Sequence, residues 1–279
     1  MIFPLCKSLV NPICCPLTQA ASAFDASAIA YINAVSATVT ISNPQRAAIN
    51  AFVVAEKAAG RWSLHKGLWF PIWGSGKAAA NAIDMVSVTS GTFAGSVTHS
   101  PNTIYFDGTT GYFNTGKSTS VNGLTPSNMG FSFLSTGIAS VDTPLMGVCN
   151  TVSDQAYLTS SGGTVYAAIG NTAWSVYQTY ATSIGAIIYT RNSSSSGVWA
   201  KCNDVGTTYS SDGNSSLGTI PNLNLFVGCQ NYIGSPTGFR AGNYGGFGMH
   251  LGMSQSQATG FVANFLSLWK TCTGVVIVP

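Results

Sequence analysis

The sequence predicts a mainly β protein built as a sandwich, with a small helical segment before it and an amphipathic helix after it. Two observations support this fold class. Short runs of β-forming residues recur between about residues 78 and 252, with Gly, Asn and Ser turns between them. Hydrophobic residues make up 46% of the 279 residues and charged residues only 7%, which argues against disorder and predicts a surface of Ser, Thr, Asn, Gly and Tyr.

The first 22 residues are apolar but interrupted by three prolines. This spacing excludes a membrane-spanning helix and disrupts a secretory signal. Ala21-Ser22-Ala23 does resemble a cleavage site, although no basic residue precedes Lys7. We expect residues 1–22 to be an extended docking arm that binds a neighbouring subunit. Its docking residues are Ile2, Phe3, Pro4, Leu5, Leu9, Pro12, Ile13, Pro16 and Leu17.

A helical lead-in is expected over residues 23–75. Asp25 can cap a helix that runs to about Val35, and a second helix has Asn43 as its cap, Pro44 at its first position and Gly60 as its stop. The predicted buried positions are Ala28, Ile29, Ile32 and Val35 in the first helix, and Ile49, Phe52, Val53 and Ala59 in the second.

Three tryptophans follow, at positions 62, 69 and 73. Packing between helix and sheet is the favoured interpretation, and an aromatic platform for a ligand is the alternative.

Residues 104–116 are the clearest β signal. The turn pair Asp107-Gly108 separates β-formers at 104–106 from Tyr112-Phe113. This pattern predicts a tight hairpin in which Gly108 and Gly111 adopt positive φ. Residues 111–118 also match the spacing of a phosphate-binding loop, but such a loop needs a helix that begins at Lys117-Ser118, and no helical period follows. A hairpin is therefore preferred over nucleotide binding.

The sandwich itself is assigned to residues 76–279. Regularly spaced short strands favour a sandwich over a parallel α/β sheet. The predicted strands are 85–88, 95–98, 103–106, 112–115, 131–135, 155–159, 165–169, 186–191, 198–201, 223–228 and 246–251. A capping box at Ser254 and Gln257 begins the last helix, which we expect to cover the sandwich or an edge strand. Its apolar face is Ala258, Phe261, Val262, Phe265, Leu266 and Trp269.

The seven cysteines, at positions 6, 14, 15, 149, 202, 229 and 272, show no metal-binding spacing. Reduced, buried thiols are the favoured interpretation. Cys202 and Cys229 fall in or beside separate predicted strands, so a disulfide between them stays open if those strands are neighbours.

Several runs together resemble a known family. These are the lead-in at 47–50 and 58–63 (AAIN and AAGRWS), FDGTTGY at 106–112, GFGMHLG at 246–252 and the final helix. They resemble the concanavalin A-like, laminin G-like jelly-roll domain, as found in bacteriophage structural proteins such as head fibres and tail-associated proteins. The start of the chain up to Pro16-Leu17-Thr18 also resembles virion-docking tails. The resemblance implies an antiparallel two-sheet jelly roll and a virion component.

The residues offer little catalytic chemistry. Glycosidases of this fold use a close carboxylate pair, yet the only glutamate, Glu56, is expected in a helix outside the sandwich. The aspartates at 25, 84, 107, 142, 154, 204 and 212 fall mostly in turns. His65, His99 and His250 are isolated in sequence, and no Gly-x-Ser-x-Gly elbow occurs. We therefore expect no catalytic residue, no cofactor and no metal. The sequons at Asn192 and Asn214 are interpreted as turns.

Glycan binding needs only aromatic faces and polar loop tips. The loop over residues 231–244 offers such groups, and packing against a neighbouring subunit is the alternative for them. The candidate contacts are Asn231, Tyr232, Arg240, Asn243 and Tyr244.

The favoured function is a non-enzymatic bacteriophage virion protein: a head fibre, capsid decoration or tail-associated protein. Residues 1–22 would dock it to capsid or tail proteins, and the sandwich would be displayed, with a host-surface glycan as a candidate ligand. Copies are expected to form a homo-oligomer. The net charge of +3 is scattered along the chain, which argues against nucleic-acid binding. The alternative is a secreted or surface carbohydrate-binding module of a bacterium. An enzyme would require the fold to bring distant carboxylates together.

Overall fold

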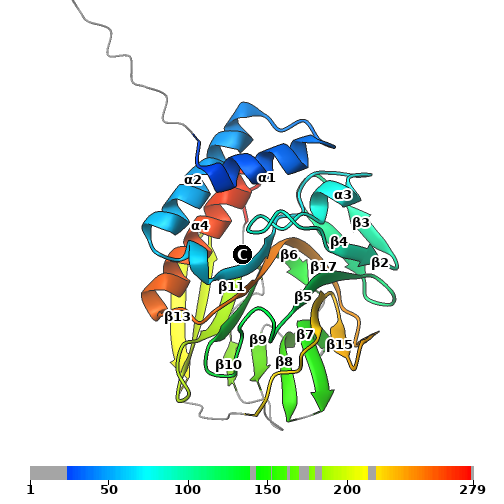
Figure 1. Cartoon of the computed structure of the whole chain (residues 1–279), viewed down its shortest axis with the longest axis vertical. Coiled ribbons are helices and arrows are strands. Elements are labelled where there is room, and N and C mark those ends of the chain that lie inside the picture. The colour runs from blue at the N-terminus through cyan, green and yellow to red at the C-terminus, as the bar shows by residue number, and fades with distance from the viewer. Residues whose placement is uncertain are drawn as a thin grey trace, which may run out of the picture.

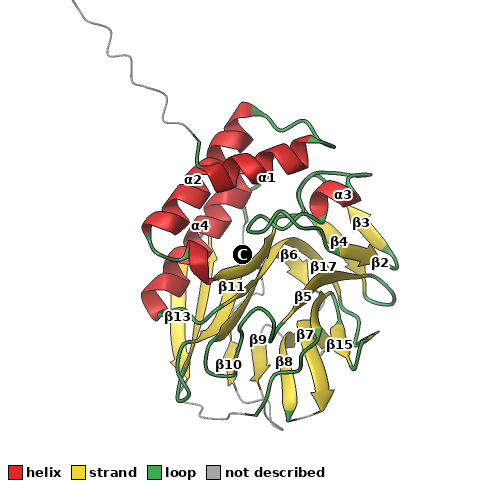
Figure 2. Ribbon diagram, in the orientation of Figure 1, coloured by secondary structure: helices red, strands yellow, loops and turns green. Residues whose placement is uncertain are grey.

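The computed structural model describes residues 24–138, 143–151, 153–161, 164–169, 176–179, 184–212 and 218–277. The expected docking arm, the sequon at Asn214 and Asp142 lie outside the described residues. Figure 2 shows helices gathered on one side of a body made of strands. No described helix combines the length and the apolar character needed to cross a membrane.

The helical elements are α1 (Ala26–Ser36), α2 (Asn43–Ala58), the 3-10 turn η1 (Trp62–Leu64), α3 (Ala78–Asn81) and α4 (Gln255–Thr273). Asp25 caps α1, and the predicted capping box of Ser254 and Gln257 begins α4, as expected. The predicted face of α4 is buried throughout. Figure 1 shows α1, α2 and α4 side by side above the strands.

Three details of the predicted helices are wrong. Ser42, not Asn43, caps α2, because its hydroxyl accepts the amide of Gln45 while the Gln45 side chain accepts the amide of Ser42. In α1, Ile29 is exposed and Tyr31 is buried instead. In α2, Ala59 is the exposed C-cap, and the fourth buried position is Glu56.

The first sheet has eight strands among the described residues. Their order is β13-β12-β11-β6-β17-β4-β3, and β1 pairs with β17. The bounds are β1 His65–Trp69, β3 Val97–His99, β4 Ile104–Asp107, β6 Met129–Ile138, β11 Gly185–Arg191, β12 Gly197–Asn203, β13 Gly206–Asp212 and β17 Ala241–His250. These strands pair antiparallel with their neighbours in the sheet. Through β1, the predicted lead-in contributes a strand to the sandwich.

The second sheet has nine strands in the described part of the chain. Their order is β10-β9-β8-β7-β14-β5-β2, with β15 and β16 at its side. The bounds are β2 Thr92–Ala94, β5 Tyr112–Ser118, β7 Thr143–Thr151, β8 Asp154–Ser161, β9 Thr164–Ile169, β10 Val176–Thr179, β14 Asn224–Val227, β15 Gln230–Tyr232 and β16 Ser235–Thr237. The pairing of β15 with β7 is parallel. The protein is therefore a two-sheet sandwich, as predicted.

The predicted strands overlap observed ones, with one exception. Residues 85–88 form a turn, because the Asp84 carboxylate accepts the amides of Val86 and Ser87 at 3.0 and 3.1 Å and bends the chain. The predicted strands do not include β1, β2, β7, β10, β13, β15 or β16.

The predicted hairpin at 104–116 is also wrong. Strand β4 belongs to the first sheet and β5 to the second, so the turn between them crosses from one layer to the other. Gly108 has φ +76°, as expected. Gly111 is needed for a different reason: a Cβ there would lie 2.2 Å from the carbonyl oxygen of Ser96. Lys117 and Ser118 lie in β5, and no helix begins there.

Two apolar cores hold the layers together, one between the helices and the first sheet and one between the two sheets. Trp69 lies in the core between the sheets, with its ring stacked 5.7 Å from that of Phe247. Trp73 lies in the helix-side core, against Phe70. The packing interpretation of these two tryptophans is confirmed.

The described cysteines Cys149, Cys202, Cys229 and Cys272 are buried free thiols. The suggested pairing of Cys202 with Cys229 is wrong, because Cys202 lies in β12 of the first sheet and Cys229 follows β14 of the second. These strands are not neighbours.

Candidate functional site

The loop residues expected to contact a glycan mostly face inward. Asn231 is buried, donating from Nδ2 to the Asn224 carbonyl at 2.7 Å and accepting the Gly234 amide at 2.9 Å. Arg240 is also buried. Its guanidinium donates to the Thr143 carbonyl at 2.7 Å and to the Ser160 hydroxyl at 2.6 Å. These two side chains hold the loop against the second sheet.

The other three loop residues are separated. Tyr244 is fully buried between the sheets, 5.2 Å from the ring of Phe106. Asn243 is half-buried in β17, and Tyr232 is 43% exposed. The structure therefore does not bring the five predicted contacts together on one exposed surface.

A different surface combines aromatic and amide side chains: the outer face of the second sheet. The described helices pack on the first sheet, with α4 lying across β11, β12 and β13 and α2 beside α4. On the second sheet, Phe113 and Val227 point into the core between the sheets. Because side chains alternate along a strand, Tyr112, Asn114 and Phe226 point outward.

The strand register aligns the outward residues in one row. Asn114 pairs with Phe226, Phe226 with Gly147, Gly147 with Tyr157, and Tyr157 with Ala168. Neighbouring strands lie about 4.8 Å apart, so the row crosses five strands over roughly 19 Å. This strip lies on one face of the sheet; Asn114 and Tyr157 are partly exposed in it, whereas Phe226, Gly147 and Ala168 are buried.

Aromatic rings gather at one end of this row. The Tyr112 ring lies 4.9 Å from that of Phe226 and 6.2 Å from that of Phe239. Phe226 is only 4% exposed, whereas Tyr112, Phe239 and Asn114 are half-buried. The strip therefore presents apolar ring surface with an amide beside it, the combination that binding sites use to stack and orient a ligand.

Sequence reasoning missed this strip. The signal was present as a period of two: Tyr112 and Asn114 in β5, and Tyr157 in β8, each alternate with core residues. What the period cannot show is which strands lie next to one another.

Four polar side chains form a buried chain beneath α4. Ser132 Oγ lies 2.7 Å from His250 Nε2, His250 Nδ1 lies 2.8 Å from His65 Nδ1, and His65 Nε2 lies 3.1 Å from Glu56 Oε2. Arg61 closes the chain with two hydrogen bonds to the Glu56 carboxylate, at 2.7 and 2.8 Å. His65 and His250, which are isolated in sequence, are thus brought together by the fold, and Glu56 lies in a helix outside the sandwich, as predicted.

The charges in this chain are matched. Burial opposes ionisation of Glu56, but hydrogen bonds from Arg61, His65 and Asn264 lower its pKa to about 2. Burial, and then the neighbouring His65, hold the pKa of His250 well below 6.5. Near neutral pH the network therefore contains one ionised carboxylate facing one guanidinium, with His250 uncharged.

The line of contacts from Ser132 through His250 and His65 to Glu56 contains the groups of a catalytic triad: a hydroxyl nucleophile, an imidazole base and a carboxylate that orients the base. However, Ser132, His65 and His250 are at most 2% exposed. Phe261 of α4 also covers both imidazoles, at 5.1 and 4.9 Å between ring centres. No reactant can reach Ser132 in this arrangement, so the chain serves to join α2, β1, β17 and β6.

The described aspartates make local contacts. Asp25 pairs with Lys57 at 2.7 Å, Asp84 with Lys117 at 3.0 Å, and Asp204 with Lys270. Asp107 accepts the amides of residues 109–111, and Asp154 accepts from Asn150 and Thr219. Among the described residues, no group of three or more His, Cys, Asp or Glu side chains is arranged so that it could hold a metal ion.

No protein-family model matches the chain, and no curated protein matches it. Several solved structures align with parts of this chain. Domain 4 of AbnA, a GH43 extracellular arabinanase from Geobacillus stearothermophilus in complex with arabinotriose, aligns at 9% identity over 71% of this chain and 98% of its own, with a TM-score of 0.48. A Trypanosoma rangeli sialidase aligns at 12% identity over 72% of this chain and 33% of its own, with a TM-score of 0.41.

The CBM40 domain of the Ruminococcus gnavus IT-sialidase aligns at 11% identity over 52% of this chain and 86% of its own, with a TM-score of 0.31. The similar structures are thus an arabinanase domain, a sialidase and a CBM40 domain. At these identities and TM-scores, the alignments assign neither a ligand nor an activity to this chain.

Proposed function

We propose that this protein is a non-enzymatic, glycan-binding β-sandwich that uses the outer face of its second sheet. The observation that carries the proposal is the strip through Asn114, Phe226 and Tyr157, with the rings of Tyr112 and Phe239 at one end. Sugar rings present C–H faces that pack on aromatic rings, while their hydroxyls exchange hydrogen bonds with amides. A neutral glycan suits this surface, because the side chains of Tyr112, Asn114, Tyr157, Phe226 and Phe239 carry no formal charge.

The non-enzymatic part of the proposal rests on the carboxylates. Glu56 is buried with Arg61 and His65, and the ion-paired aspartates 25, 84 and 204 already have cationic partners. Most glycosidase families use two carboxylates that face a common substrate.

The proposed setting is a bacteriophage virion, to which residues 1–22 attach the sandwich as part of a homo-oligomer. The support is the sequence resemblance to phage head-fibre and tail-associated proteins, together with the apolar, proline-interrupted composition of that segment. The host-surface glycan would then be the natural ligand. A bacterial surface module is the competing setting.

The binding test uses the full chain on a glycan array, followed by affinity measurements for the best glycan. We expect Tyr112→Ala to weaken binding at least tenfold, because its partly exposed ring is lost from the strip. The matched control is Tyr209→Ala, which removes a tyrosine that is 57% exposed on β13 of the other sheet. Absence of any array signal from correctly folded protein would overturn the glycan proposal.

The setting is tested separately. We expect the chain without residues 1–22 to lose attachment to phage particles while keeping its glycan affinity. Full occupancy of particles by the shortened chain would contradict the docking role. A mature N-terminus near Phe24 would favour the bacterial surface module instead.

A further inference from the structure

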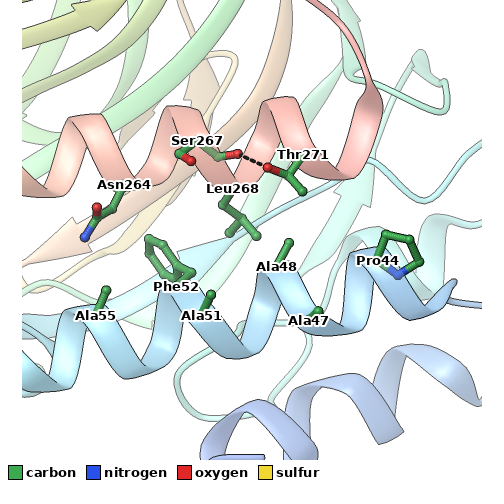
Figure 3. Close-up of a pocket in the computed structure, with 10 residues that line it drawn as sticks. All are labelled: Pro44, Ala47, Ala48, Ala51, Phe52, Ala55, Asn264, Ser267, Leu268 and Thr271. Atoms are coloured by element: carbon green, nitrogen blue, oxygen red, sulfur yellow. Dashed lines mark hydrogen bonds between the residues drawn. The ribbon is translucent and has the colours of Figure 1, made fainter.

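An apolar groove of about 570 Å³ runs between α2 and α4. Figure 3 shows its two walls: Pro44 and four alanines along α2, facing Ser267, Leu268 and Thr271 on α4. The ring of Phe52 and the methyl groups of Leu268 lie at the base of the groove, and both side chains are buried. Ala47 and Ala51 are exposed. A groove of this size is large enough to hold several side chains of a partner.

Two of the polar side chains at the groove already make hydrogen bonds within the protein. The Thr271 hydroxyl donates to the Ser267 carbonyl at 2.9 Å, and the Asn264 amide donates to Glu56 at 2.8 Å. None of the ten lining residues carries a formal charge. The groove therefore favours an occupant that is apolar and needs few hydrogen bonds from its surroundings.

We propose that this groove binds residues 2–17 of the same chain. This segment contains Ile2, Phe3, Leu5, Leu9, Val10, Ile13 and Leu17, and Lys7 is its only charged residue. Its three prolines lack an amide hydrogen and favour an extended chain. Burying such a chain against alanines leaves fewer unpaired amides than burying an ordinary peptide would.

The described chain begins close enough to the groove for the preceding segment to reach it. The amide of Asp25 donates to Asn50 of α2 at 2.7 Å, and the Asp25 carboxylate pairs with Lys57 of α2. Both contacts fix the start of the described chain beside that helix. The seven residue-to-residue steps from Leu17 to Phe24 can span about 23 Å when the chain is extended. A 16-residue helix such as α2 is about 24 Å long, so residues 2–17 can reach the groove along its whole length.

Tethering also favours the chain's own segment over that of a second copy. A short flexible linker holds the segment at an effective concentration in the millimolar range. This assignment goes beyond the proposed function, because it concerns the helix side of the molecule and not the glycan-binding sheet. If the same segment also docks to a virion, it must leave the groove to do so.

Cysteines at 6, 14 and 15 provide a direct probe in the unmodified protein. We expect these thiols to be alkylated at least tenfold more slowly in the full chain than in a synthetic peptide of residues 1–22, as followed by peptide mass mapping. Ala51→Glu places a charge in the groove and should restore the peptide rate. Val54→Glu is the matched control, since Val54 is 46% exposed on α2 but does not line the groove.

Thr271→Lys places a charge on the α4 wall of the groove. It tests the same proposal independently, in case the α2 variant fails to fold. Peptide-like rates in the unmodified chain would overturn the proposal. Protection that persists in both groove variants would do so as well. Protection that disappears on dilution, together with dissociation of a dimer in sedimentation velocity, would assign the groove to the segment of a second copy and refute the same-chain assignment.

Discussion

The imidazole rings of His65 and His250 meet nitrogen to nitrogen, 2.8 Å apart, in the interior of the protein. Each contact of the network has one donor if Ser132 donates to His250, His250 to His65, and His65 to Glu56. Residues from α2, β1, β6 and β17 are thereby joined by a single line of hydrogen bonds. Removing one member takes at least one hydrogen bond from a buried neighbour, so substitutions in the network should be destabilising.

The first prediction concerns Glu56→Gln. The substitution keeps the shape of the side chain but leaves the Arg61 guanidinium without its counterion, so we expect a loss of about 3 kcal/mol in the free energy of unfolding. Equilibrium unfolding in urea measures this loss. The control is Asp25→Asn at the partly exposed pair with Lys57, which should cost less than about 1 kcal/mol. Equal losses in the two variants would argue against a buried charge network.

The second prediction concerns the loss of folding stability at acid pH. The pKa of Glu56 is about 2 in the folded protein, against an ordinary value of 4.5. A lowered carboxyl pKa contributes stability that is present above pH 4.5 and is lost as the pH falls towards 2. The difference corresponds to roughly 3 kcal/mol. Unfolding curves between pH 5 and pH 2.5 should show a smaller loss in Glu56→Gln than in the unmodified protein.

The third prediction concerns the histidines. Because burial lowers the pKa of His250 below 6.5, the unfolded chain binds a proton more readily than the folded one. The resulting stability is fully present above pH 6.5 and declines as the pH falls below it. Between pH 7.5 and 5.5, His250→Gln should flatten this decline more than His99→Gln, since His99 is only half-buried and its pKa is lowered by burial alone. Equal slopes of unfolding free energy against pH in the two variants would refute the assignment of this decline to His250.

The fourth prediction concerns the contact between β17 and α4. A Cβ on Gly246 would lie 2.3 Å from the ring of Phe265, so Gly246→Ala must displace α4 or the strand. We expect a loss of about 1–3 kcal/mol in thermal or urea unfolding. Gly137→Ala in β6 is the control, because the nearest atom to its Cβ would be 3.9 Å away. A stability unchanged in Gly246→Ala would show that α4 can shift freely.

The candidate site was only partly accessible from the sequence. Aromatic residues alternating with core residues mark β5 and β8 as strands with one outward face. The strip exists because β14 and β7 lie between these two strands, although β14 is more than sixty residues later in the chain than β8. Conversely, the loop residues Arg240 and Tyr244 suggested a surface, yet both are buried: Arg240 donates hydrogen bonds to the second sheet and Tyr244 lies between the sheets.

The amino-acid sequence by itself determined the elements whose stability depends on near neighbours. The capping box of Ser254 and Gln257 and the apolar face of α4 involve contacts within a few residues, so they could be predicted. Only the tertiary structure decided that the turn after Asp107 passes between sheets, and that Ser132, His250, His65 and Glu56 meet. These outcomes depend on which distant strands pair and which faces are buried together, and the free energy of that pairing is shared over the whole fold.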